Sequence, residues 1–252
     1  MSEEIATTTS EPAPEMSELA TLGNIMIEPG RTFEDLRRKP RFILAGLVTI
    51  MLVSIFQIAL VEKIGLDKMV RDRIESSSQS SQLSAEQKDK IIEQQAGSVA
   101  KVVTYASVPI VMTIVFFVGG LIYFLGINAL GGTAKYLSSV SVWVYSSLPP
   151  TILFFIANIA VLLIKSADEI EIGRAQQGLI QANPSFFVDG KSQPVLSAIL
   201  QTFDLFQLIG WVLAAIGLRV VAKTSAGAAW AVVLIVALIG VSVRVVFALL
   251  FG

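Results

Sequence analysis

The sequence predicts an all-α polytopic membrane protein: a five-transmembrane-helix bundle with an amino-terminal interfacial helix pair and an outer helical hairpin. Three observations lead to this prediction. Of the 252 residues, 54% are hydrophobic and only 15% are charged, a balance that leaves too little polar surface for a soluble domain. The apolar residues form long continuous runs instead of recurring on one face of a helix. Five runs reach about 20 residues or more, enough at about 1.5 Å per residue to cross a hydrocarbon core of about 30 Å.

The five runs define one membrane domain, residues 42–252, in which two longer outer loops separate some of the spans. The first run contains no charged residue. The second is longer than a span needs and contains Pro109, so we expect a tilt or a kink there. The predicted spans are residues 42–61, 102–130, 140–164, 199–221 and 227–251, and the outer loops are residues 62–101 and 165–198.

The segment before the first span has two parts. Residues 1–16 are rich in Ser, Thr, Glu and Pro and are predicted to be a disordered tail, because they hold too little apolar surface to offset the entropy of ordering. Residues 17–41 are predicted to form two short cytoplasmic interfacial helices.

The two short helices are predicted from spacing and from their end signals. Apolar residues recur at intervals of three and four within residues 17–27, and Pro29 is expected to end that helix. Thr32 followed by Asp35 resembles a capping box that starts the second helix. Both helices either lie flat on the membrane surface or pack on the bundle, and the sequence favours neither placement.

The distribution of Lys and Arg predicts the orientation of the chain, because positive residues in short segments beside the spans stay in the cytoplasm. Five basic residues fall within residues 31–41, and Lys135 and Lys223 lie in the short loops that should share the same side. We therefore expect the amino terminus in the cytoplasm and the carboxyl terminus outside.

The first outer loop is predicted to form a helical hairpin. Residues 62–75 continue the helical character of the first span, and Ser84 with Gln87 resembles a capping box for a second helix. Independent solvated helices are the alternative. The residues expected along the seam are Ile64, Met69, Ile74, Ile91, Ile92, Gln95 and Val99.

Two charged residues stand out inside the predicted spans, because a charge costs roughly 2.5 kcal/mol or more near the centre of a helix. Asp204 and Arg244 lie at matching depths in neighbouring antiparallel helices, so we expect them to form an intramembrane ion pair. The pair would fix helix packing, or Arg244 would extend toward the outer surface. A role in proton or substrate handling is the alternative.

The residue types that are missing exclude much chemistry. The chain has no Cys and no His, which removes thiol nucleophiles, imidazole bases and the commonest zinc and haem ligands. Asp204 is the only acid in the spans, so no catalytic residue, cofactor site or metal site is predicted. The net charge of −1 makes nucleic acid an unexpected partner.

Polar and small residues inside the spans are typical of helix packing in membranes. Small residues that allow close helix approach are Gly119, Gly120 and Gly126 in one span and Gly210, Ala214 and Gly217 in another. Residues expected to hydrogen bond between helices are Gln57, Asn128, Asn158 and Gln207.

Three segments carry short motifs in order along the chain. The first is a Pro-x-x-Thr-Phe element before the first span, the second begins with a double glycine after the second span, and the third combines an acid, a Trp and a Gly-Leu pair. The positions that carry these motifs are Pro29, Thr32, Phe33, Gly131, Gly132, Pro149, Asp204, Trp211 and Gly217. Together the three segments resemble the YIP family, named for the binding of Ypt and Rab GTPases, in its bacterial branch.

The resemblance implies a five-helix bundle with a cytoplasmic amino end in a bacterial cytoplasmic membrane, and it implies no reaction. The first functional hypothesis is a non-enzymatic membrane protein that organises or recruits partners through its amino-terminal helices and outer hairpin. Its expected partners are the lipid bilayer and proteins at the membrane, including further copies of the chain. The alternative hypothesis is a small-solute or ion permease or channel component.

Overall fold

A computed structural model describes residues 15–76, 82–170, 178–190 and 192–251. The predicted disordered tail, residues 1–16, lies almost wholly outside the described residues. The described residues form helices and connecting turns without a β-strand. Several of these helices are able to cross a membrane, so the predicted all-α membrane bundle is confirmed.

Among the described residues, four helices are long and apolar enough to cross a membrane, or five if a bent pair counts as one span. The bent pair joins α9 (Pro194–Leu200) and the 3-10 turn η4 (Gln201–Phe203) to α10 (Leu205–Val221) at an angle of 51°. The prediction of one continuous helix over residues 199–221 is therefore wrong. Asp204 has extended backbone angles and separates the two parts. The four other spans are α3 (Ile43–Ile64), α6 (Ser98–Ala129), α7 (Tyr136–Ile164) and α11 (Ala226–Phe251).

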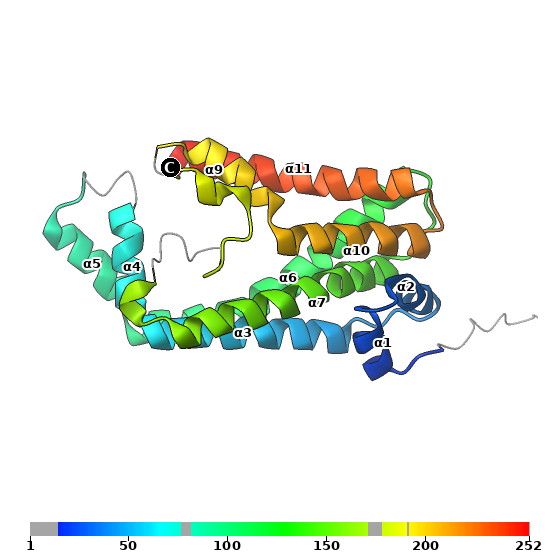
Figure 1. The fold of residues 1–252 in the computed structure, drawn as a ribbon, viewed down its shortest axis with the longest axis horizontal. Helices are drawn as coiled ribbons and strands as arrows, with labels where there is room; N and C mark the ends of the chain where they lie inside the picture. Colours follow the sequence, from blue (N-terminus) through cyan, green and yellow to red (C-terminus); the bar gives the residue numbers. More distant parts are fainter. Residues whose placement is uncertain (1–14, 77–81, 171–177, 191, 252) are drawn as a thin grey trace, which may run out of the picture.

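The spans form one bundle (Figure 1). Helices α3, α6 and α7 pack against one another, and α10 and α11 lie along them, with α10 packed on α7 and α11 in contact with α6. The helices α1 (Glu18–Asn24) and α2 (Pro29–Arg38) lie at one end of the bundle. The hairpin of α4 (Leu66–Ser76) and α5 (Ala85–Ala96) lies at the opposite end.

Helix α7 is the centre of the bundle because its buried face carries small residues. Ser138, Ser139 and Ser141 are fully buried, and the hydroxyls of Ser139 and Ser141 donate to carbonyls one turn back, so these two groups are paired within their own helix. Facing them, a Cβ atom on Gly120 of α6 would lie 2.7 Å from the Cα of Val140. This close approach lets α6 pack tightly on α7, which α3 and α10 also contact.

The amino-terminal helices differ from the sequence prediction in their boundary. Helix α2 begins at Pro29, so Pro29 starts the second helix instead of ending the first, and Thr32 lies inside α2 instead of capping it. Proline suits a first helical position because the missing N–H would have no partner there. Phe33 and Leu36 have no exposed surface and α2 packs on α10, so α2 takes the placement on the bundle.

The predicted hairpin of α4 and α5 is present, with both bonds of the Ser84–Gln87 capping box. Its seam is shorter than predicted. Val70 and Ile92 are buried, whereas Gln95 and Val99 are exposed and the prediction was wrong for them. Gly97 has extended backbone angles that separate α5 from α6, which turns this part of the chain away from α4.

Candidate functional site

The site lies at the break in the bent span. Hydrogen bonds of Asp204 and Leu205 stabilise this break. The Asp204 carboxylate accepts from the Phe206 N–H at 3.0 Å, which caps α10, and from the Asn183 side-chain amide at 3.2 Å. The Leu205 N–H donates to the Ala182 carbonyl at 3.0 Å. Asp204 therefore starts a helix inside the membrane domain and ties the preceding loop to that start.

The same loop folds back into the bundle onto α7. Asn158 is fully buried, its side-chain oxygen accepts from the N–H groups of Leu179 and Ile180, and its amide donates to the Phe154 carbonyl. Gly178 has φ +120°, and a Cβ atom there would lie 2.6 Å from the Phe154 ring. Asn158, expected to bond between helices, thus anchors a loop instead. This irregular backbone inside a membrane domain is satisfied by protein groups.

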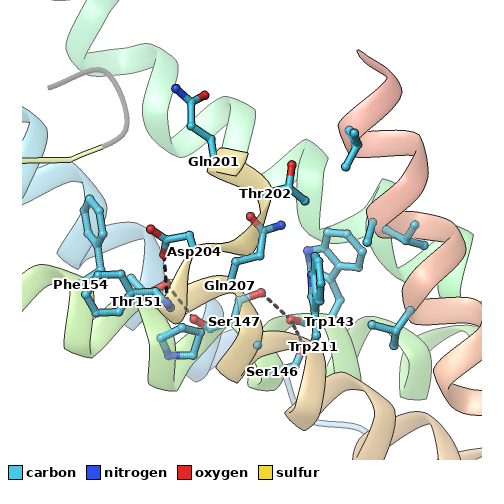
Figure 2. Close-up of a pocket in the computed structure, with 18 of the residues that line it drawn as sticks. Trp143, Ser146, Ser147, Thr151, Phe154, Gln201, Thr202, Asp204, Gln207 and Trp211 are labelled. Atoms are coloured by element: carbon cyan, nitrogen blue, oxygen red, sulfur yellow. Dashed lines mark hydrogen bonds between the residues drawn. The ribbon is translucent and has the colours of Figure 1, made fainter. Parts of the chain in front are cut away.

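A cavity of about 560 Å³ lies beside the break, between α7, α10 and α11. Figure 2 shows Asp204 and Gln207 on one part of its wall and the rings of Trp143 and Trp211 on another. Its size falls within the range of small-molecule sites. Its polar and charged lining residues are Ser146, Ser147, Thr151, Gln201, Thr202, Asp204, Gln207 and Arg244.

Arg244 and Asp204 both line this cavity. No salt bridge joins them among the described residues, and the Nη1 atom of Arg244 is buried without a hydrogen-bond partner. An arginine side chain stays protonated in proteins. The cavity is therefore lined by a guanidinium group that forms no ion pair with Asp204 within the described residues.

A second polar cluster lies at the other end of the bundle. Arg41 forms an ion pair with Asp35, and their side chains are only 9% and 2% exposed. Arg41 also donates to the Met16 carbonyl at 2.6 Å and to the Thr21 hydroxyl at 3.0 Å. Its Nε atom alone has no partner. The cluster joins α1 and α2 to the start of α3, and we call α1 and α2, residues 18–38, the amino-terminal platform.

The surface of the platform carries a hydrogen-bonded ion pair as well. Arg37 donates to Glu34 from Nε at 3.2 Å, and this bond lowers the pKa of the Glu34 carboxyl and raises the pKa of the Arg37 guanidinium. The platform also exposes Leu19 and Ile27, by 75% and 80%. Its free face is therefore both charged and apolar.

Two of the predicted motif positions, Phe33 and Gly217, meet in space at the platform end. A Cβ atom on Gly217 would lie 2.9 Å from the Phe33 ring, so this glycine lets α2 reach α10. Gly131, at φ +84°, and Gly132 end α6 with paired bonds to Asn128 and Ile127, which is the pattern of a Schellman motif. Other motif positions lie elsewhere: Pro149 is buried within α7, and Asp204 and Trp211 line the cavity.

Sequence reasoning missed the Asp35–Arg41 pair, although a signal was present. Thr32, Asp35 and Leu36 have the spacing of one helix face, and all three are buried. An acid on the buried face of a helix requires a partner. The hydroxyl groups of the cavity gave no such signal, because a serine or threonine in a span is usually satisfied by its own helix.

These features define a polytopic α-helical membrane protein with a polar cavity at a broken span. The model of the Yip1 domain family matches residues 23–248, which includes α2, every span and the cavity. The chain therefore belongs to the Yip1 domain family, and the family resemblance is confirmed. No curated protein and no solved structure shows significant similarity to the chain.

Proposed function

We propose that this Yip1-family membrane protein is non-enzymatic and recruits or organises protein partners at the membrane through its amino-terminal platform. One observation carries the proposal: a buried ion pair fixes the platform to the bundle while its free face exposes apolar and basic residues. A surface fixed in this way loses little conformational entropy when a partner binds. The exposed Ile27 and Arg31 suit a partner surface that combines apolar and acidic side chains.

The proposed topology places the platform in the cytoplasm of a bacterial cell and the carboxyl terminus outside, since five crossings put the two ends on opposite sides. The chain has no Cys, so single-cysteine variants report without background. In intact cells, an impermeant maleimide should label Ser84→Cys on the hairpin and leave Ser17→Cys beside the platform unlabelled. The reverse pattern would invert the proposed topology.

Crosslinking in native membranes tests the recruiting role. A photo-crosslinking amino acid at Ile27 should capture a distinct protein, and one at Gln94 tests the hairpin as a second contact surface. The same probe at Ile27 combined with Asp35→Asn is the matched control, because that variant removes the ion pair without replacing any residue of the free face. Capture at Ile27 that ignores Asp35→Asn, or no capture there, contradicts the platform as the recruiting surface. A product of twice the chain mass would identify a second copy as the partner.

A second candidate function is a small-solute or ion permease, and the cavity beside the broken span is the observation that favours it. Irregular helices around a polar site inside the membrane are typical of transporters. Flux measured in liposomes containing only the purified chain tests this candidate. Solute uptake that depends on the protein would favour transport, whereas platform crosslinks without uptake favour recruitment.

A further inference from the structure

The Arg244 guanidinium, which lines the cavity, lacks a hydrogen-bond partner for one of its nitrogen atoms. The Nη1 atom of Arg244 is buried and has no hydrogen-bond partner. A guanidinium group keeps its charge in a protein, and Arg244 is half-buried in the membrane bundle, where a charge without an ionic partner is unfavourable. The other unpaired nitrogen, Nε of Arg41, belongs to a group that already binds a carboxylate. Arg244 therefore differs from Arg41 in lacking an anionic partner within the described residues.

Asp204 does not fill that role, although it lines the same cavity. Its two carboxylate oxygens accept from Phe206 and Asn183, and these bonds hold the break in the span. Gln207 also lines the cavity, and no hydrogen bond to its side chain is formed within the described residues. A charged donor and an amide thus line one space without a protein acceptor.

We propose that the cavity binds a ligand with a singly charged anionic oxygen group, a phosphodiester or a carboxylate, on Arg244. Guanidinium groups bind such oxygens through paired hydrogen bonds, and the Gln207 amide supplies a further donor. The carboxylate of Asp204 in the same cavity disfavours a multiply charged anion. The rings of Trp143 and Trp211 form an apolar wall, so the ligand also has an apolar part. A lipid and a soluble amphiphile both meet this description.

The inference goes beyond the platform, because it needs no protein partner. It also requires only that a ligand binds, whether or not the ligand crosses the membrane. Its failure is therefore separate from failure of the crosslinking or flux experiments. The tryptophans provide a local reporter, since Trp143 and Trp211 line the cavity and the chain has only three tryptophans. A Trp230→Phe background leaves those two as the only tryptophan fluorophores.

The lipid arm of the test uses nanodiscs that contain brominated phosphatidylglycerol, with brominated diacylglycerol as a probe that lacks the phosphodiester. Bromine quenches tryptophan at short range. We expect stronger quenching by the phosphatidylglycerol and a loss of its apparent affinity of about tenfold in Arg244→Gln. Arg219→Gln is the matched control, because Arg219 is exposed on α10 and does not line the cavity.

The soluble arm titrates the protein in detergent with glycerophosphoglycerol and with octanoate, read by the same fluorescence. If the fluorescence change on adding the probe is lost in Arg244→Gln in this arm alone, the ligand is soluble. If it is lost in the lipid arm alone, the ligand is a lipid. Equal binding by the parent and Arg244→Gln, or binding in neither arm, overturns the proposal. If Arg244→Gln does not fold, Gly240→Leu replaces it, because the position of a Cβ atom there is open. Loss of binding in that cavity-filling variant supports the proposal, and unchanged binding overturns it.

Discussion

Two arginines at opposite ends of the bundle show how differently one residue type is used in this protein. Arg41 contacts Asp35, the Met16 carbonyl and Thr21, and it joins three helices. Arg244 lines a cavity with an unpaired Nη1 atom. The charge of Arg41 is paired with Asp35 and holds the platform, whereas the charge of Arg244 has no ionic partner within the described residues. The platform end is thus suited to rigidity and the cavity end to binding.

The largest effect is expected at Asp35. Asp35→Asn leaves the Arg41 guanidinium buried without a carboxylate, which typically lowers the free energy of unfolding by about 3–5 kcal/mol. Chemical unfolding in detergent, followed by circular dichroism, measures this loss. The double variant Asp35→Asn with Arg41→Met removes both charges, so it should be more stable than Asp35→Asn alone. A single variant as stable as the parent would mean that the platform is held by packing and not by the ion pair.

Two glycines of one helix, α10, extend the contrast to packing. Gly217→Ala places a methyl group against the Phe33 ring and against Val142, at 2.8–2.9 Å, and such overpacking should destabilise the fold by about 1–3 kcal/mol. Gly210→Ala is the matched control, because its nearest contact is an ordinary 3.5 Å and alanine favours a helix. It should be neutral or stabilising in the same unfolding assay. Equal effects at both sites would remove the difference in packing between the two ends.

The sequence predicted the spans well because the bilayer imposes a simple rule. A helix must be long and apolar, and four of the five predicted runs became continuous helices. The remaining run, residues 199–221, is interrupted at Asp204. A single acid in an apolar run is compatible with a continuous helix or with a helix start, and only the partners of Asp204, Asn183 and the Phe206 N–H, distinguish them. Asn183 comes from a loop whose path no local pattern predicts.

The site was predicted only in part for the same reason. Asp204 and Arg244 were selected because charges in spans are rare, and the structure brings both to one cavity. That they form no ion pair within the described residues could not be predicted, because the course of the chain around Asp204 depends on the 51° bend and on the loop anchored by Asn158. The Phe33–Gly217 contact joins two motif positions that the sequence placed in separate elements. Such long-range contacts are set by tertiary packing and leave no periodic signal.

The same substitution at the two arginines gives effects of opposite sign. Arg41→Met leaves Asp35 buried without its partner and should be strongly destabilising. Arg244→Met removes an unpaired charge and adds apolar surface, so in the absence of ligand the stability should be unchanged or higher by up to about 2 kcal/mol. The unfolding assay on protein stripped of lipid measures both. Comparable destabilisation by Arg244→Met would show that Arg244 has a structural partner, which would end the contrast between the two ends.

The smallest effect is expected one residue before Asp35, where the Glu34–Arg37 pair is partly exposed at 41% and 28%. Solvent screens such a pair, so Glu34→Gln should lower stability by only about 0.5 kcal/mol. Because Arg37 lowers the pKa of Glu34 below its ordinary value of 4.5, this stabilisation is present above that value and is lost as the pH falls through the lowered pKa. Unfolding of the parent and the variant at pH 7 and near pH 3 checks the sign. A difference that grows on acidification would mean that Glu34 is favoured in its protonated form, and the exposed pair would then contribute nothing to holding the platform.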